Sequence, residues 1–258
     1  MKIGIIGVGH LGVALATGYA KAGRASDVIL SPRSAAKSAS LHDQFGLKVA
    51  ETNDDVVRAS DALIISVRPA DVIETVRMLP WRKDQVAISV AAGITAGSLR
   101  GAVIPADAAR AMPVMASALN ESAIPLFPSN ELAIKALDPL GAVTAFDDED
   151  SFNKTSALGA WFGWLFQLVG ETTDALSSSG VDAIAARKVS ADMMRAAGAF
   201  MAHDPDRDPI EVLRDLATPG GITEVGLRTL KDADAFSPWH KAMADSIHRL
   251  EELGRSKD

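Results

Sequence analysis

Glycines near the start of the chain have a spacing that suits the binding of a dinucleotide. Gly7, Gly9 and Gly12 form the pattern G-x-G-x-x-G, directly after a short apolar run and at the start of a helical pattern. Such glycines allow a tight turn, a close approach of the backbone to a pyrophosphate, and close contact between helix and strand. We therefore expect a cofactor to contact Gly7, Gly9, His10, Leu11 and Gly12, with His10 a loop side chain near the phosphates rather than a catalyst. A purely structural turn is the alternative.

The residues after the second apolar run indicate which dinucleotide binds. A carboxylate at this position would bind the ribose 2′-hydroxyl and repel a 2′-phosphate. The chain instead has Ser31, Arg33 and Ser34 here, two hydroxyls and a forked cation that suit a phosphate. NADP is therefore the favoured cofactor, and NAD remains possible. The alternative is that Arg33 is a solvated loop residue.

Two further loops follow apolar runs that we predict to be strands. One contains Val67, Arg68 and Pro69, and the other contains Ala92 and Gly93. Open α/β sheets bind their ligands at the carboxyl ends of the strands, so we expect these residues to line the cofactor. Proline and glycine are also ordinary turn residues, and the main argument for these loops is their position.

A second glycine turn lies in the C-terminal half. Gly220, Gly221, Ile222 and Thr223 stand where a predicted helix begins, directly after Pro219. Free backbone N–H groups at a helix start suit a carboxylate, and Thr223 adds a hydroxyl donor. A simple capped helix has the same appearance, so both interpretations stay open on the residues alone.

Strand and helix patterns alternate through the first 150 residues. Short apolar runs bounded by turn residues indicate buried strands, and apolar residues at helical spacing indicate helices. The predicted strands are 3–8, 28–30, 62–67, 85–90, 108–112 and 142–146, and the predicted helices are 11–22, 35–45, 54–59 and 71–79. Right-handed crossovers between such strands predict a parallel, doubly wound sheet of the Rossmann type.

The pattern changes after the acidic stretch 147–150. From there on we find only helical patterns, at 152–176, 181–202, 209–217, 221–232 and 238–253. We therefore predict two domains, an NADP-binding α/β domain over residues 1–150 and an all-helical domain over residues 151–258.

The composition excludes several classes of function. With 26 basic against 33 acidic residues among 258, the net charge is -7, which argues against a nucleic-acid binder. The chain has no cysteine, so thiolate metal sites and a cysteine nucleophile are excluded, and we expect no metal site. The first apolar run is too short for a secretory signal, and no later run approaches ~18 apolar residues. We expect a cytoplasmic protein without a membrane partner.

Two common classes of dehydrogenase do not fit the chain. Short-chain dehydrogenases need a Tyr-x-x-x-Lys pair, but Gly23 lies four residues after Tyr19, the only tyrosine. The β-hydroxyacid dehydrogenases need a lysine in a glycine-rich helix, and the sequence around Lys188 lacks those glycines.

Several motifs, in the same order over nearly the whole chain, resemble those of one enzyme family. They are the glycine run at 3–12, Val67-Arg68-Pro69, the segment 89–94 with Ala-Ala-Gly-Ile, Arg110-Ala111-Met112-Pro113, and Thr218-Pro219-Gly220-Gly221-Ile222-Thr223. The last is similar to the signature Ser-Pro-Gly-Gly-x-Thr of the pyrroline-5-carboxylate reductases, the family that catalyses the last step of proline synthesis.

The resemblance implies both an architecture and a reaction. It implies a Rossmann domain followed by a helical dimerisation domain, assembled as a homodimer or a ring of dimers. It implies that hydride passes from NADPH to the C=N carbon of a cyclic imino acid, 1-pyrroline-5-carboxylate, to give proline. The backbone of Gly220, Gly221 and Ile222 would hold the substrate carboxylate, and Thr223 would lie beside the imine nitrogen as the catalytic hydrogen-bond partner or proton donor.

Two segments differ from the pattern of the family. The chain has apolar residues at 113–116 where the family continues with an asparagine, and two tryptophans enter the segment 157–164. Trp161 and Trp164 either reshape the substrate pocket or lie in the core or the dimer interface. The alternatives are therefore a reductase of a different imine or carbonyl compound, and a non-catalytic NADP-binding regulatory protein.

Overall fold

The computed structural model describes residues 1–255, which divide into two compact units. Unit 1 contains Met1–Gly159 together with the chain from Ile247 onward, and unit 2 is Ala160–Ser246. We describe each unit by itself. The domain boundary expected at residue 150 stays a prediction.

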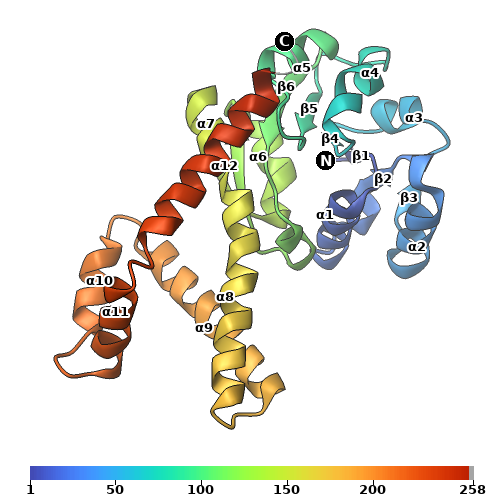
Figure 1. The fold of residues 1–258 in the computed structure, drawn as a ribbon. Helices are drawn as coiled ribbons and strands as arrows, with labels where there is room; N and C mark the ends of the chain where they lie inside the picture. Colours follow the sequence, from blue (N-terminus) through green and yellow to red (C-terminus); the bar gives the residue numbers. More distant parts are fainter. Residues whose placement is uncertain (256–258) are drawn as a thin grey trace. The chain divides into compact units, whose positions relative to one another are not determined.

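Unit 1 is built on one eight-stranded sheet (Figure 1). The strand order is β3-β2-β1-β4-β5-β6-β7-β8, and every neighbouring pair is parallel except β6 and β7. The strands are β1 (Ile3–Ile6), β2 (Val28–Leu30), β3 (Lys48–Val49), β4 (Ala62–Ile65), β5 (Val86–Ser89), β6 (Asp107–Ala111), β7 (Ser122–Phe127) and β8 (Gly141–Ala145). All six predicted strands are confirmed, whereas β3 and β7 were not predicted.

The position of β1 gives the sheet its functional edge. β1 pairs with β2 on one side and with β4 on the other, so the chain winds in opposite directions from it. Ligands of open α/β sheets bind outside the carboxyl ends of the strands at such a reversal. The predicted Rossmann class is thus confirmed, and the glycines that follow β1 lie at the expected binding edge.

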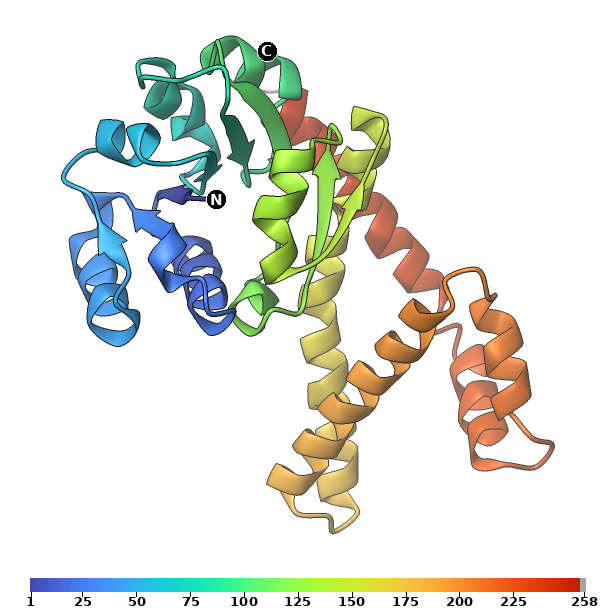
Figure 2. The ribbon, with the colours of Figure 1, turned by 180° about the vertical axis from the view of Figure 1, so that it is seen from behind.

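Helices cover both faces of the sheet, which Figure 2 shows from behind. Alternate residues of each strand enter opposite cores: Ile5 and Ile64 pack on one face, and Ile6 and Ile65 pack on the other. Residues of α1 (His10–Lys21), α2 (Ala35–Phe45) and α6 (Glu131–Leu137) belong to the first core. Residues of α3 (Asn53–Arg58), α4 (Val72–Arg77) and α5 (Ala96–Ala102) belong to the second.

A buried tyrosine joins the first helix to α6. The hydroxyl of Tyr19, fully buried, donates a hydrogen bond of 2.7 Å to the carbonyl of Ala136. Burial raises the pKa of Tyr19 far above its ordinary value, so the hydroxyl stays protonated and remains a donor. This bond fixes the helix whose first turn lies at the binding edge.

The remaining chain is helical, as predicted, with one difference at its start. The helices are α7 (Glu149–Thr155), α8 (Leu158–Ser178), α9 (Ala183–His203), α10 (Pro209–Leu216), α11 (Ile222–Asp232) and α12 (Ser237–Arg255). The single helix predicted over 152–176 is wrong, because the chain breaks between α7 and α8. There the Ser156 hydroxyl donates a hydrogen bond to the carbonyl of Phe152. The N–H of Ala157 donates to the carbonyl of Lys154, and these two bonds tighten the last turn of α7.

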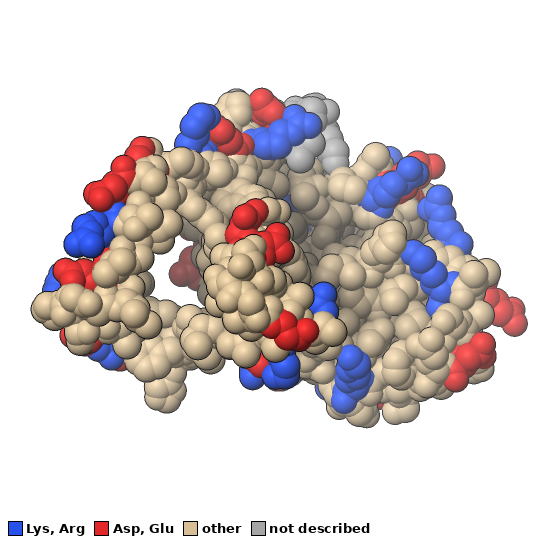
Figure 3. All heavy atoms as spheres, turned by 60° about the horizontal axis from the view of Figure 1, so that its bottom comes forward, with Lys and Arg blue, Asp and Glu red and all other residues tan. Residues whose placement is uncertain are grey.

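The surface carries mixed charges. On the face shown in Figure 3, acidic and basic side chains are interspersed among uncharged ones, and no single basic patch covers this face. Within the described residues, no helix combines the length and the apolar character needed to span a bilayer.

Candidate functional site

Steric demands explain two of the three glycines in the turn between β1 and α1. Gly7 has φ +95°, and a Cβ there would lie 2.6 Å from the carbonyl oxygen of Ser66. A Cβ at Gly12 would lie 2.3 Å from the carbonyl oxygen of Gly7. Side chains at these positions would therefore push apart the turn, the helix and the loop after β4.

Gly9 differs because its surroundings are open. A Cβ at Gly9 would meet no heavy atom within 4 Å. Gly9 is also the N-cap of α1, no side chain caps this helix, and its first turn holds no acidic residue. Free N–H groups and the positive end of the helix dipole therefore border open space, which suits a pyrophosphate. His10 at the first helical position is exposed, and Leu11 is half-buried.

The end of β2 contributes one buried and one exposed group. The Ser31 hydroxyl is buried and accepts a 3.0 Å hydrogen bond from the N–H of Gly7, so it holds the glycine turn in place. Arg33 lies exposed on a 3-10 turn, Pro32–Ser34, and Ser34 forms the N-cap of α2. No carboxylate follows directly after β2, so the structure places no negative charge here that would repel the 2′-phosphate of NADP.

Arg33 lines a cavity of about 300 Å³ together with Asn53, Asp71, Glu74 and Thr75. Asp71 is engaged by the Arg68 guanidinium, with 3.0 Å between Nε and Oδ2. Arg33 forms no ion pair with the described residues. Its guanidinium thus remains available at the edge of a hollow, as a donor for a phosphate.

The loops after β4 and β5 lie at the same edge of the sheet as the glycine turn. Ser66 comes directly after β4, and its backbone packs against Gly7. Val67, Arg68 and Pro69 follow Ser66 in this loop. Ala92 and Gly93 follow β5, which pairs with β4 in parallel register. Unit 1 therefore brings all thirteen predicted cofactor residues to the carboxyl-end edge of its sheet or to the first turn of the helix that follows.

A buried arginine that sequence analysis assigned no role lies beside the loop after β5. Arg110 on β6 is 4% exposed, and its Nη1 lies 2.6 Å from Glu149 Oε1 and 2.8 Å from Asn153 Oδ1. Its guanidinium also stacks on the ring of Phe152, 4.6 Å from the centroid. Burial lowers the pKa of Arg110, and the hydrogen bond and negative charge of the Glu149 carboxylate oppose that effect.

Glu149 connects this arginine to the predicted cofactor loop. Its Oε1 also accepts a 2.7 Å hydrogen bond from the N–H of Ala96, the first residue of α5. One carboxylate thus fixes α7, β6 and the end of the loop that contains Ala92 and Gly93. An arginine between the alanines of a predicted strand is the signal that could have revealed this buried ion pair.

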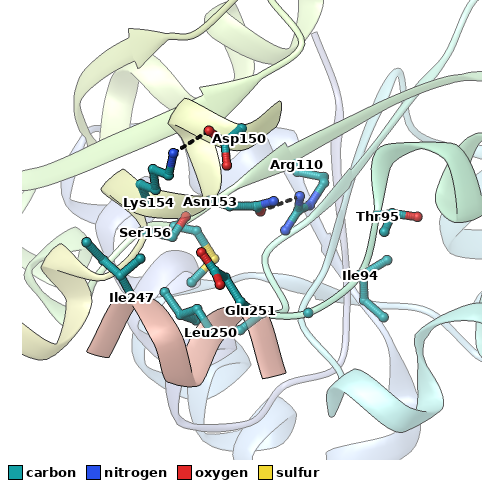
Figure 4. Close-up of a pocket in the computed structure, with 13 residues that line it drawn as sticks. Ile94, Thr95, Arg110, Asp150, Asn153, Lys154, Ser156, Ile247, Leu250 and Glu251 are labelled. Carbon is teal, nitrogen blue, oxygen red and sulfur yellow. Dashed lines mark hydrogen bonds and ion pairs between the residues drawn. The ribbon is translucent and has the colours of Figure 1, made fainter. Parts of the chain in front are cut away.

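A cavity of about 320 Å³ opens between this loop, β6, α7 and the end of α12 (Figure 4). Ala92, Gly93, Ile94 and Thr95 line one side. Arg110 comes from β6 and Met112 directly follows this strand, and residues of α7 and α12 complete the wall. Since two predicted cofactor residues belong to this wall, the cavity adjoins the predicted cofactor site.

The second glycine turn, in unit 2, is partly occupied by a side chain of its own helix. Gly220 has φ +72°, and its N–H donates a 2.6 Å hydrogen bond to Glu224 Oε2. The N–H of Gly221, the N-cap of α11, donates to the carbonyl of Thr218. Ile222 is 94% exposed, and Thr223 is half-buried and its hydroxyl forms no hydrogen bond with the described residues. The turn therefore already holds a carboxylate.

The two tryptophans of the segment 157–164 lie in unit 2. Trp164 packs edge-on against Trp239, with 5.8 Å between the ring centroids, and both line an apolar hollow of about 340 Å³. Trp161 is 40% exposed. The contact with Trp239 favours a packing role for Trp164 within unit 2.

The helices of unit 2 leave much apolar surface uncovered. No residue of α8 is buried, and Ala186 is the only buried residue of α9. Large apolar side chains on these helices are more than half exposed, namely Phe166, Ile184, Val189, Met193 and Phe200. Helices with exposed apolar faces of this extent are typical of a surface that another chain covers.

Comparisons with known proteins agree with this two-part organisation. Residues 2–93 match the family model described as NADP oxidoreductase coenzyme F420-dependent, and residues 149–253 match the one described as pyrroline-5-carboxylate reductase dimerisation. A pyrroline-5-carboxylate reductase of Methanosarcina acetivorans is 26% identical over 271 residues, which cover 98% of each chain.

Solved structures show the same fold over the whole chain. A pyrroline-5-carboxylate reductase of Coxiella burnetii is similar with a TM-score of 0.83 at 22% identity, over 98% of each chain. A pyrroline carboxylate reductase of Plasmodium falciparum with NADP bound is similar with a TM-score of 0.82 at 18% identity, again over 98% of each chain.

Proposed function

We propose that this chain, which belongs to the pyrroline-5-carboxylate reductase family, reduces the C=N bond of a cyclic imino acid, 1-pyrroline-5-carboxylate, to give proline. It is an oxidoreductase that uses NAD(P)H, and NADP is the cofactor that its binding edge fits. The observation that carries the proposal is the start of α1, where uncapped N–H groups face open space beside Gly9 and no carboxylate follows β2.

The residues of unit 1 are suited to hold the dinucleotide. The start of α1 presents backbone N–H groups to the pyrophosphate, from Gly9, His10, Leu11 and Gly12. Gly7 provides the tight turn before them, and its own N–H donates to the Ser31 hydroxyl, which fixes that turn. Arg33 and Ser34 bind the 2′-phosphate. The nicotinamide end is lined by two loops, with the residues Val67, Arg68, Pro69, Ala92 and Gly93.

The reaction requires little covalent chemistry from the protein. When bound, NADPH supplies a hydride to the carbon of the C=N bond, and a proton reaches the nitrogen, so the imine becomes a secondary amine. The chain must therefore position the ring and keep the nitrogen protonated. Thr223 is the proposed hydrogen-bond partner or proton donor of that nitrogen, and the backbone of Gly220, Gly221 and Ile222 is the proposed holder of the substrate carboxylate.

Assembly and location belong to the same proposal. The exposed apolar faces of α8 and α9 favour a homodimer, from which a ring of dimers can form. The substrate is a small imine, nucleic acids and membranes are not partners, and the protein acts in the cytoplasm.

Steady-state oxidation of NADPH tests the proposed activity. The substrates would be 1-pyrroline-5-carboxylate, the carboxylate-free ring 1-pyrroline, and an open-chain imine. We expect turnover with the first and a much lower kcat/KM with the other two. Tight NADPH binding without turnover of any imine would instead favour a regulatory protein, and preference for 1-pyrroline would favour a different imine substrate.

A further inference from the structure

Glu224 lies midway in the sequence between two groups that can hold its carboxylate. Its Oε2 accepts the 2.6 Å hydrogen bond from the N–H of Gly220, four residues before it. Arg228 lies four residues after it in α11, on the same face of the helix. A glutamate followed by a cation at this spacing is the favourable order for an ion pair on a helix. Two arrangements are therefore open to Glu224, and the structure shows the one on Gly220.

Arg228 is not engaged in this arrangement. It is exposed and forms no ion pair with the described residues. Glu224 and Arg228 both line a cavity of about 530 Å³ between α10 and α11. Because both side chains are exposed on this wall, Glu224 can move from Gly220 to Arg228 by rotation about its own side-chain bonds, without movement of the helix.

A carboxylate bound at the turn would change the balance between the two arrangements. The proposed function places the substrate carboxylate on the backbone of Gly220, Gly221 and Ile222. The single N–H of Gly220 cannot satisfy two carboxylates, and two negative charges in contact repel each other. Glu224 must then leave the turn and needs a new partner.

The spacing along α11 identifies Arg228 as that partner. Arg214 and Lys231 are the other cations that line the same cavity. Lys231 lies seven residues after Glu224, about two helical turns away, and Arg214 belongs to a different helix, α10. Arg228 alone among the three has the four-residue spacing at which side chains of one helix meet.

We propose that Arg228 is a positioning residue for the substrate, which binds the Glu224 carboxylate when the carboxylate of the substrate occupies the turn. Arg228 acts only through Glu224 and touches neither substrate nor cofactor. The role rests on the proposed function, since it needs a substrate whose carboxylate binds at residues 220–222. It favours substrates with a carboxylate, because a neutral ring does not compete with Glu224 for Gly220.

Steady-state kinetics with two substrates test this role. Arg228→Gln should raise the KM for 1-pyrroline-5-carboxylate by about threefold or more, the size of a lost exposed ion pair. Its kcat, and the KM for 1-pyrroline, should stay as in wild type. Arg228→Lys keeps the charge and should restore most of the lost affinity. Lys231→Gln, the matched control, removes one charge from the same cavity and should behave as wild type.

A double-mutant cycle separates this role from a general attraction between Arg228 and an anionic substrate. In Glu224→Gln no carboxylate has to be moved, so the further change Arg228→Gln should leave the KM nearly unaltered. The proposal is overturned if Arg228→Gln raises the KM by the same factor with and without Glu224. It is also overturned if Arg214→Gln raises the KM and Arg228→Gln does not.

A binding measurement distinguishes failure of this role from failure of the proposed function. The full chain, saturated with NADP, is titrated calorimetrically with cyclopentanecarboxylate, a ring acid that has no C=N bond to reduce. We expect tighter binding in Glu224→Gln, weaker binding in Arg228→Gln, and binding in the double variant close to that of Glu224→Gln. Circular dichroism checks that each variant is folded.

Each outcome of the two experiments has a distinct meaning. If wild type reduces no imine but the ring acid shows the expected pattern, the proposed function fails and the role of Arg228 stands. If wild type reduces 1-pyrroline-5-carboxylate but neither KM nor ring-acid affinity depends on Arg228, the role of Arg228 fails alone. A ring acid that binds to none of the folded variants also overturns the role.

Discussion

The two glycine turns of this protein both begin a helix, but they present different environments to a ligand. At the start of α1, no side chain caps the helix and Gly9 borders open space. At the start of α11, the Glu224 carboxylate already accepts the N–H of Gly220. The N–H groups at the start of α1 are thus free to bind an anion, whereas the start of α11 already holds the carboxylate of Glu224.

This difference teaches that a helix start must be judged by what its own chain places there. Asp and Glu in a first turn satisfy N–H groups and the helix dipole, as a bound anion would. The first turn of α1 contains no acidic residue, whereas that of α11 contains Glu224. We therefore expect the α1 turn to bind a doubly charged pyrophosphate and the α11 turn to bind a single carboxylate in competition with Glu224.

Substitution of Gly12 should have the largest effect on the α1 turn. In Gly12→Val, the new side chain would collide with the backbone of Gly7, since even a Cβ lies 2.3 Å from its carbonyl oxygen. We expect NADPH binding, measured by fluorescence titration, to be lost. Gly101→Ala in α5, where a Cβ meets nothing within 4 Å, should bind normally and gain about 0.5–1 kcal/mol of stability. Normal NADPH affinity in folded Gly12→Val would contradict the assigned turn.

The Thr223 hydroxyl should be the most important side chain of the α11 turn. Thr223→Ala should lower kcat for imine reduction by about 100-fold or more, the size of a lost proton donor. Thr223→Ser keeps the hydroxyl and should retain most of the activity. The measurement is the rate of NADPH oxidation at saturating substrate. An alanine variant with full kcat would remove the catalytic role.

Arg33 should determine the preference for NADP. Arg33→Ala should weaken NADPH binding by about ten- to hundred-fold, because it removes a charge-assisted contact to the 2′-phosphate. NADH affinity should hardly change, since NADH lacks that phosphate. Arg58→Ala, an exposed arginine on α3 outside the Arg33 cavity, is the control. Equal losses for both cofactors would show that Arg33 acts on something other than the phosphate.

We expect the smallest effect on the kinetics from substitution of Glu224, the residue in which the two turns differ most directly. Glu224→Gln keeps an oxygen that can accept from Gly220 but removes the negative charge. The KM for 1-pyrroline-5-carboxylate should fall by about three- to tenfold, the size of one exposed like-charge contact, while the KM for 1-pyrroline stays the same. If both KM values change together, Glu224 does not compete with a carboxylate.

Local patterns in the sequence were sufficient for most of unit 1. The strands β1, β2, β4 and β5 are short, mainly apolar runs in which every residue is buried, as expected for strands covered on both faces. The glycine pattern at 7–12 was itself visible in the sequence, although the contact that requires Gly7 comes from the loop after β4. β7 was missed because Pro125 interrupts its pattern, and a proline argues against a strand with neighbours on both sides. Pro125 is accommodated because its carbonyl, rather than an N–H, bonds Met112.

The cluster around Arg110 could not be predicted in the same way. Its partners Glu149 and Asn153 lie 39 and 43 residues away, and Glu149 belongs to an acidic stretch that has the composition of a domain boundary. Only the sheet order and the packing of α7 bring these charges together. The hydrogen bond between Gly220 and Glu224 is local, by contrast, and a glutamate in the first turn of a predicted helix was the available signal.

The central claim, that the chain transfers a hydride to a C=N carbon, can be tested by one isotope measurement. NADPH that carries deuterium at the transferred position is incubated with the protein and 1-pyrroline-5-carboxylate, and the product is examined by mass spectrometry and NMR. The account predicts proline with one deuterium on the ring carbon that was double-bonded to nitrogen. Bound NADPH with no deuterated proline formed would contradict it.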